Sequence, residues 1–246
     1  MVQIQILEFK KMQLDGATMI DGFPSVGLAS TIAANYLVAS LELDQVAAID
    51  SNYFPPMSMV YSSKPKFPAR IYADENKKIA VCVSEFTPIT YLDRPLAKTI
   101  FEWSQKQRCS LIITSVGMPA EEKEQAPHES AVLGVGSTER ARKRLDEAKV
   151  GQLELGIISG ISGVLMNLGR WENYDVIALL AKVHPQIADA MAAAKLVEAY
   201  NKLLPEVEVD VGPLKEVAEN IEGRLKTLRT SVKPVEGPVP TSEMYA

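Results

Sequence analysis

The sequence predicts an α/β protein in which helices cover a β-sheet. Short apolar stretches of strand length alternate along the chain with longer segments whose apolar residues recur at helical spacing. Two of the short stretches, Leu111–Ile113 and Val176–Leu180, are continuously apolar. Such runs are typical of central strands that are buried on both faces.

Strands are predicted where apolar and β-branched residues gather between turn-forming residues. In chain order these segments are Val2–Leu7, Ala17–Asp21, Gln45–Ile49, Arg70–Ala73, Lys78–Ser84, Ser110–Val116, Ala131–Gly134, Leu155–Ile158 and Asp175–Leu180. The first segment alternates apolar and polar residues, and it lacks the basic-then-apolar layout of a signal peptide.

Helices are predicted in the segments between these strands and after the last of them. They are Ser25–Leu41, Tyr91–Lys106, Thr138–Ala148, Pro185–Leu204 and Gly212–Leu228. In the fourth helix, one apolar face is formed by Ala193, Leu196, Val197, Tyr200 and Leu204. Pro185 fits the first turn of that helix, where its missing N–H has no partner to lose.

The last predicted helix, Gly212–Leu228, carries a short heptad stripe opposite a charged face. The stripe follows a 4-3-4-3 spacing through Leu214, Ala218, Ile221, Leu225 and Leu228. Gly223 costs this helix roughly 1 kcal/mol relative to alanine, so we expect support from outside the helix. The stripe fits either a terminal helix packed on its own domain or a contact between subunits.

Apolar periodicity stops after Leu228, and we expect a domain boundary near Thr230. Residues 1–229 would form a single α/β domain, and residues 230–246 a flexible, proline-containing tail. The tail ends in Met244-Tyr245-Ala246, which offers an apolar side chain, a phenol and a carboxylate. These three groups have the chemistry of a plug for a pocket on another protein. We therefore expect the partner-binding residues at this end.

Composition places the chain among ordinary globular proteins. It has 246 residues, of which 47% are hydrophobic and 23% charged, and its formal net charge is −5. That charge argues against non-specific nucleic-acid binding. No apolar run approaches the ~18–20 residues of a membrane span. Cys82 and Cys109 lie in apolar surroundings, which suits buried thiols in a reducing cytoplasm better than a disulfide.

Two glycine-rich segments are candidate ligand loops. The first contains Gly22, Pro24 and Gly27, with Ser25 as a possible helix cap, and its helix N-terminus could hold an anion. Its spacing is neither that of a dinucleotide-binding loop nor that of a P-loop, so a structural turn is favoured. The second, Ser159–Gly163, is predicted to follow a strand.

The second segment, with Gly160, Ser162 and Gly163, does not have the spacing of a hydrolase nucleophile elbow. Close approach between backbones is favoured there, and a small-ligand pocket remains the alternative. The sequence has two histidines, His128 and His184. His128 lies in an acidic loop with no second imidazole or thiolate nearby, His184 precedes Pro185 at a predicted helix start, and no spacing supports a catalytic triad. We expect no metal, no cofactor and no catalytic residue.

Taken in order, several motifs resemble those of the archaeal members of the proteasome assembly chaperone 2 family. They are Gly22-Phe23-Pro24-x-Val26-Gly27-Leu28, Gly117-x-Pro119, the segment Gly160–Leu165, His184-Pro185, and a C-terminal hydrophobic–tyrosine–any (HbYX) motif in Met244-Tyr245-Ala246. The resemblance covers about residues 10 to 205. It implies a three-layer α/β/α sandwich similar to nucleoside phosphorylases without their catalytic residues. It also implies homo-oligomers that bind the α-ring of the core proteasome.

The sequence therefore favours a cytoplasmic, homo-oligomeric protein that binds core-proteasome α-subunits through its tail. It would act as an assembly chaperone or as an ATP-independent activator-like factor. The alternative is an enzyme or sensor for a nucleoside or phosphorylated small molecule, which would use the two glycine-rich loops at strand ends. A third reading is a scaffold whose tail has no function.

Overall fold

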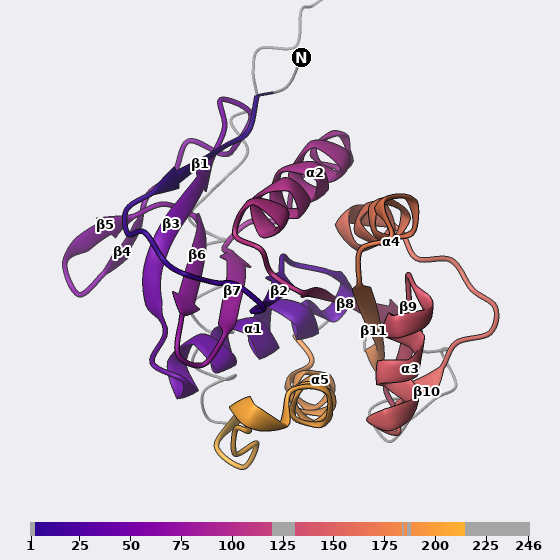
Figure 1. Ribbon diagram of the computed structural model, residues 1–246. Helices are drawn as coiled ribbons and strands as arrows, with labels where there is room; N and C mark the ends of the chain where they lie inside the picture. Colours follow the sequence, from indigo (N-terminus) through magenta and orange to yellow (C-terminus); the bar gives the residue numbers. More distant parts are fainter. Residues whose placement is uncertain (1–2, 120–130, 184, 186–187, 215–246) are drawn as a thin grey trace, which may run out of the picture.

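The computed structural model describes residues 3–119, 131–183, 185 and 188–214. In this part of the chain, a nine-stranded mixed sheet forms the centre of the molecule (Figure 1). From one edge to the other, its strands are β1 (Gln5–Glu8), β3 (Asp44–Asp50), β6 (Ala69–Asp74), β7 (Ile79–Ser84), β2 (Thr18–Gly22), β8 (Leu111–Pro119), β11 (Val176–Val183), β9 (Leu133–Gly136) and β10 (Gly151–Gln152).

The four middle strands, β7, β2, β8 and β11, run parallel to one another. The apolar runs Leu111–Ile113 and Val176–Leu180 are buried in β8 and β11, which confirms that they are central strands. Strands β6 and β9 flank this group in the antiparallel direction. The carboxyl ends of the four parallel strands therefore meet along one edge of the sheet.

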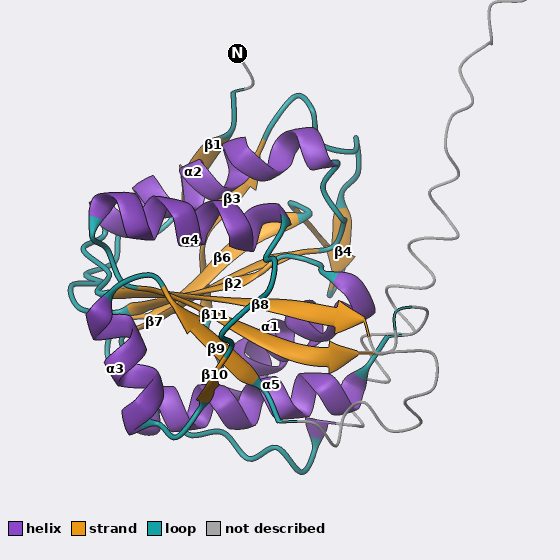
Figure 2. Cartoon of the chain, turned by 90° about the vertical axis from the view of Figure 1, so that its right-hand side faces the viewer, coloured by secondary structure: helices purple, strands orange, loops and turns teal. Residues whose placement is uncertain are grey.

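Helices cover both faces of the sheet (Figures 1 and 2). One face carries α1 (Ala29–Ser40) and α5 (Ala190–Leu203), and the other carries α2 (Thr90–Lys106) and α4 (Gly160–Glu172). Helix α3 (Glu139–Glu147) packs beside β9 and β10. Ile20 of β2 joins the core under α1 and α5, and its neighbour Met19 joins the core under α2 and α4. The predicted α/β fold, a large sheet between helices, is confirmed.

Helix α4 is absent from the sequence prediction, although it is 13 residues long. Its three glycines lower its intrinsic helix propensity. Two of them allow close packing: a Cβ on Gly163 would lie 2.3 Å from the Ile158 carbonyl oxygen, and one on Gly169 would lie 2.5 Å from Val176 Cγ2. Tertiary packing therefore outweighs local propensity in this segment.

The strand predicted at Leu155–Ile158 is wrong. These residues form irregular chain between β10 and α4, and the side chains of Leu155 and Ile157 are 92% and 93% exposed. The chain leaves the sheet after β10, which pairs with β9 over only two residues. A strand needs a partner along its length, and this segment has none within the described part of the chain.

A second sheet, also absent from the prediction, is the hairpin of β4 (Met59–Tyr61) and β5 (Lys64–Lys66). An ion pair between Arg70 of β6 and Glu85 anchors it, and both side chains are almost fully buried. The Tyr61 hydroxyl of the hairpin donates a hydrogen bond of 2.7 Å to the same Glu85 carboxylate. The hairpin thus depends on contacts distant in sequence.

Two predicted helices begin later than expected. Residues Val26–Leu28 form a short 3-10 helix, η1, and Gly27 and Leu28 take left-handed φ values of 70° and 55°, so α1 begins at Ala29. Pro185 lies in a turn and not in a helix.

Helix α5 begins only at Ala190, where the Asp189 side chain caps it by accepting a hydrogen bond of 2.9 Å from Ala192 N. After α5, a 3-10 helix, η3 (Pro205–Val207), continues the chain. Of the predicted helix Gly212–Leu228, everything from residue 215 on lies outside the described residues, as does the tail.

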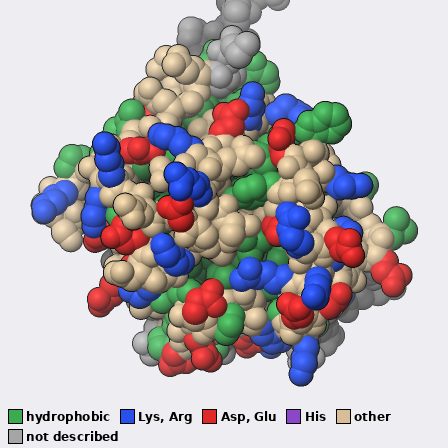
Figure 3. Space-filling model, in the orientation of Figure 1, with side chains coloured by type: hydrophobic (Ala, Val, Ile, Leu, Met, Phe, Trp, Pro, Cys, Tyr) green, Lys and Arg blue, Asp and Glu red, His purple; other side chains and the backbone are tan. Residues whose placement is uncertain are grey.

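On the face shown in Figure 3, basic and acidic side chains are interspersed, with hydrophobic side chains between them. Among the described residues, no helix is both long and apolar enough to cross a bilayer.

Candidate functional site

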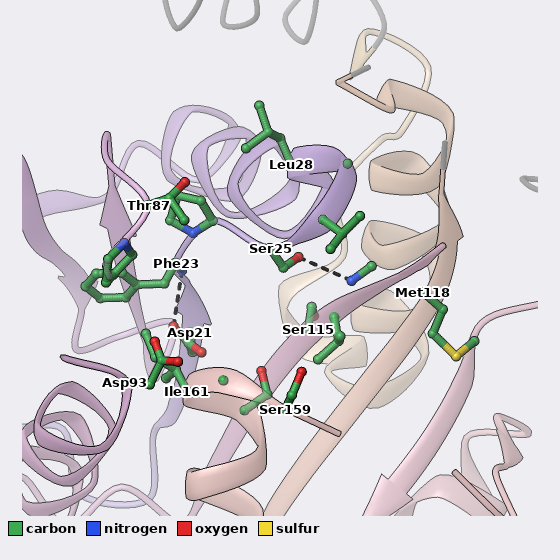
Figure 4. Close-up of a pocket in the computed structure, with 18 of the residues that line it drawn as sticks. Asp21, Phe23, Ser25, Leu28, Thr87, Asp93, Ser115, Met118, Ser159 and Ile161 are labelled. Carbon is green, nitrogen blue, oxygen red and sulfur yellow. Dashed lines mark hydrogen bonds between the residues drawn. The ribbon is translucent and has the colours of Figure 1, made fainter. Parts of the chain in front are cut away.

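A cavity of about 820 Å³ opens at the carboxyl ends of the parallel strands (Figure 4). Its described walls come from five parts of the chain that are far apart in the sequence: 21–28, 87–93, 115–119, 157–162, and the two residues Pro185 and Ala188. We call it the strand-end pocket. Open α/β sheets bind ligands at this edge, where loops from neighbouring strands diverge.

The first wall is the predicted glycine-rich turn after β2, and close packing explains its glycines. A Cβ on Gly22 would lie 2.2 Å from Ala34 Cβ, and one on Gly27, at φ +70°, would lie 2.7 Å from Val183 Cβ. Gly117 of β8 faces the same turn, and its Cβ would lie 2.0 Å from the Val26 carbonyl oxygen. Glycine is therefore the residue that fits at these three positions.

Ser25 does not cap the following helix, which corrects the sequence expectation. Its hydroxyl instead accepts a hydrogen bond of 3.2 Å from Gly117 N, drawn in Figure 4, and lies 2.9 Å from the Ser30 hydroxyl. Ser25 thus ties the turn to the neighbouring strand β8. Pro24 also lines the strand-end pocket.

The second predicted loop, Ser159–Gly163, forms the start of α4 and another wall. Gly160 has a left-handed φ of 68°, and a Cβ on Gly163 would lie 2.3 Å from the Ile158 carbonyl oxygen, so both positions suit glycine. The Ser162 hydroxyl is buried and lies 2.6 Å from the hydroxyl of Thr114 in β8. The structure therefore brings both predicted loops into one pocket.

A buried carboxylate, that of Asp21, lies at the end of β2. It is 3% exposed, and it accepts hydrogen bonds from Phe23 N (3.1 Å) and from Thr114 Oγ1 (2.8 Å). Burial raises the pKa of Asp21 from its ordinary 3.8 to about 6, although both hydrogen bonds lower it. No ion pair with Asp21 occurs among the described residues.

A second carboxylate, that of Asp93 in the first turn of α2, also lines the strand-end pocket (Figure 4). Burial raises the pKa of Asp93, too. Its Oδ2 lies 3.8 Å from the position that a Cβ on Gly160 would take, which places it beside the start of α4.

Neither Asp21 nor Asp93 was identified as a site residue by sequence reasoning. The available signal for Asp21 was an acidic residue within an otherwise apolar strand, Thr18-Met-Ile-Asp-Gly. The described pocket walls carry hydroxyl groups and these two carboxylates, but no lysine or arginine.

The other residues that the sequence analysis singled out lie either away from the strand-end pocket or outside the described residues. Cys82 and Cys109 are buried, unpaired thiols, and burial raises the pKa of Cys109 to about 12. His128, His184 and the partner-binding residues Met244, Tyr245 and Ala246 lie outside the described residues. In the part of the chain that the structure describes, no three His, Cys, Asp or Glu side chains are grouped for a metal ion.

Known proteins of similar structure include two from one archaeon. PbaA of Pyrococcus furiosus, described as an archaeal homolog of proteasome-assembly chaperone, is 30% identical, with a TM-score of 0.81 and coverage of 93% of this chain and 97% of that chain. PbaB of the same organism, described as an archaeal proteasome activator, shares the fold at 23% identity, with a TM-score of 0.73 and coverage of 93% and 100%.

Sequence comparison gives a matching result. An uncharacterised protein of Methanocaldococcus jannaschii is 25% identical over 225 residues, which span 92% of this chain and 90% of that protein. The family model described as PAC2 family matches residues 19–229, most of the chain. The protein described here therefore belongs to the PAC2 family.

Proposed function

We propose that this protein binds the core proteasome and acts as an assembly chaperone or an ATP-independent activator-like factor. The observation that carries the proposal is its 30% identity to PbaA over 93% of the chain, since PbaA is described as a homolog of a proteasome-assembly chaperone. Membership of the PAC2 family supports it. In this role the protein is a binding protein of the cytoplasm, not an enzyme, and uses no cofactor.

The contact with the α-ring would be made by the last three residues of the sequence. Met244 would fill an apolar cleft between α-subunits, and the Tyr245 ring and hydroxyl would pack and hydrogen-bond at its rim. The carboxylate of Ala246 would pair with a lysine in the pocket. The chemistry of these three groups supports the assignment.

The tail has enough reach for this contact if residues 1–229 form one domain. From Thr230 onward, ~15 residues at ~3.1 Å each span roughly 45 Å in extended polyproline form. A single tail binds weakly, because ordering it costs conformational entropy. We therefore propose that the protein is a homo-oligomer whose tails dock together, which raises the effective affinity by ~10²–10⁴ where the geometry allows.

Capture of purified core proteasome on immobilised protein tests the proposal. The full chain should retain the proteasome, and deletion of Met244–Ala246 should abolish retention, because the tail follows the last periodic apolar residue and should bury nothing in its own domain. Tyr53→Ala is the matched control, since Tyr53 is an exposed tyrosine (53%) in the folded part. Full retention by the truncated protein would refute the docking mechanism.

A second candidate function is favoured by one observation, the position of the strand-end pocket at the carboxyl ends of parallel strands. In that reading the protein is an enzyme or sensor for a nucleoside or phosphorylated small molecule. A thermal-shift screen with nucleotides and sugar phosphates separates the two readings, because only the second expects large stabilisation. The two carboxylates in the pocket walls weigh against an anionic ligand.

A further inference from the structure

The strand-end pocket has the size and the lining of a small-molecule site. Its volume of about 820 Å³ lies within the ~300–1,000 Å³ typical of such sites. Its described walls include apolar side chains, among them Phe23, Met118, Ile157 and Ile161. An apolar body of moderate size would therefore find matching surface there.

The polar groups in the walls are rich in hydrogen-bond acceptors. Each Asp21 oxygen accepts one hydrogen bond from the protein, which leaves a further lone pair on each oxygen. Asp93 adds a second carboxylate to the same cavity, with no ion pair to it among the described residues. In the described walls no lysine or arginine faces these two carboxylates, and a donor group on a ligand would fit their remaining lone pairs.

The charge of the described walls disfavours one common class of ligand. A phosphate or another polyanion would enter a space that already holds two carboxylates and, in its described walls, no lysine or arginine. The N-terminus of α4 offers backbone N–H groups there, but Asp93 lies beside its first residue, Gly160. Its carboxylate offsets the partial positive charge at that end of the helix.

We propose that the strand-end pocket binds a small molecule that carries a protonated amine on an apolar body, with the ammonium group directed at Asp21 and Asp93. An ammonium group supplies three donors and a compensating charge, which matches the acceptors of these two residues. The site lies within the folded part of the chain and does not depend on the proteasome proposal.

Three probes that share the indole ring and differ in charge test the proposed amine site: tryptamine, tryptophol and indole-3-acetate. Titration calorimetry at neutral pH should give tryptamine at least about tenfold tighter binding than tryptophol, with indole-3-acetate weakest. AMP serves as the nucleotide probe and should not bind. Tighter binding of indole-3-acetate or AMP than of tryptamine would overturn the proposal, and so would no binding of tryptamine at about 10 mM.

Variants locate the binding in the pocket. Asp21→Asn and Asp93→Asn should each weaken tryptamine binding by about tenfold or more, because each removes a charge that faces the ammonium group. Asp15→Asn is the control, since Asp15 is exposed and pairs with Arg108. Circular dichroism verifies folding. Unchanged tryptamine binding in both pocket variants would refute the assignment, whereas unchanged proteasome capture by them would show that the two functions are separate.

Discussion

Replacing Asp21 by asparagine should stabilise this protein at neutral pH. The carboxylate is 3% exposed and its pKa is raised from 3.8 to about 6. The folded protein thus binds the proton more tightly than the unfolded chain does. The contribution of this group to stability is fully present below pH 3.8 and is lost as the pH rises through 6.

The size of the effect follows from the same two pKa values. The difference between 3.8 and about 6 corresponds to roughly 3 kcal/mol of lost stability at pH 7.5, at about 1.4 kcal/mol per pH unit. At pH 4.5 the loss is only about 1 kcal/mol. Asparagine cannot ionise, and its carbonyl can still accept the hydrogen bond from Phe23 N. Thr114 can turn its hydroxyl hydrogen toward Ser162, 2.6 Å away, and accept from the amide.

Urea denaturation at several pH values and one fixed protein concentration measures the effect, because association changes apparent stability. The gain in free energy of unfolding for Asp21→Asn should grow with pH and approach about 3 kcal/mol at pH 7.5. Asp15→Asn should change stability by less than about 0.5 kcal/mol at any pH, since Asp15 is exposed. A destabilised Asp21→Asn protein at pH 7.5, or a gain independent of pH, would refute the reasoning.

Three further predictions concern the tail, the last helix and the turn packing. Extending the chain past Ala246 should weaken proteasome binding as much as Tyr245→Ala does, because the extension replaces the terminal carboxylate by a neutral amide. Modest shortening of the tail around residues 235–237 should be tolerated. Normal proteasome binding by the extended protein would contradict the plug mechanism. Replacing Ile221 and Leu225 together by lysine should lower the mass measured by light scattering if the heptad stripe joins subunits, and an unchanged mass with a native spectrum would assign the stripe to the intrachain core. Gly117→Ala should destabilise the protein by about 3 kcal/mol in urea denaturation, because the added Cβ would lie 2.0 Å from the Val26 carbonyl oxygen. The control Gly151→Ala should cost less than about 1 kcal/mol, because its Cβ would meet only Leu133 Cδ2 at 3.3 Å. Equal losses of stability in the two variants would contradict the packing argument.

The central strands could be predicted because each contains consecutive apolar residues. Leu111–Ile113 and Val176–Leu180 are apolar without interruption, and a strand covered on both faces requires that pattern. The glycines of the turns were predictable for a related reason, since close backbone approach leaves glycine as the residue that fits.

Features that depend on distant partners could not be predicted. Helix α4 is stabilised by packing of its glycines against Ile158 and Val176, and intrinsic helix propensity does not include such tertiary contacts. Exposed Leu155 and Ile157 alternate as strand residues do, but no neighbouring strand pairs with them in the described structure. The buried carboxylate of Asp21 accepts a hydrogen bond from Thr114, which is 93 positions away in the sequence.

The wide separation of the pocket walls along the chain has a consequence for the order of synthesis. The walls run from residue 21 to residue 188, and the last of them follows β11, which pairs between β8 and β9 in the sheet. A nascent chain on the ribosome has no such pocket until Ala188 has emerged and β11 has inserted. A molecule that binds the pocket would therefore distinguish chains that extend past residue 188 from shorter ones, and fluorescence of a bound indole would report completion of the sheet in real time.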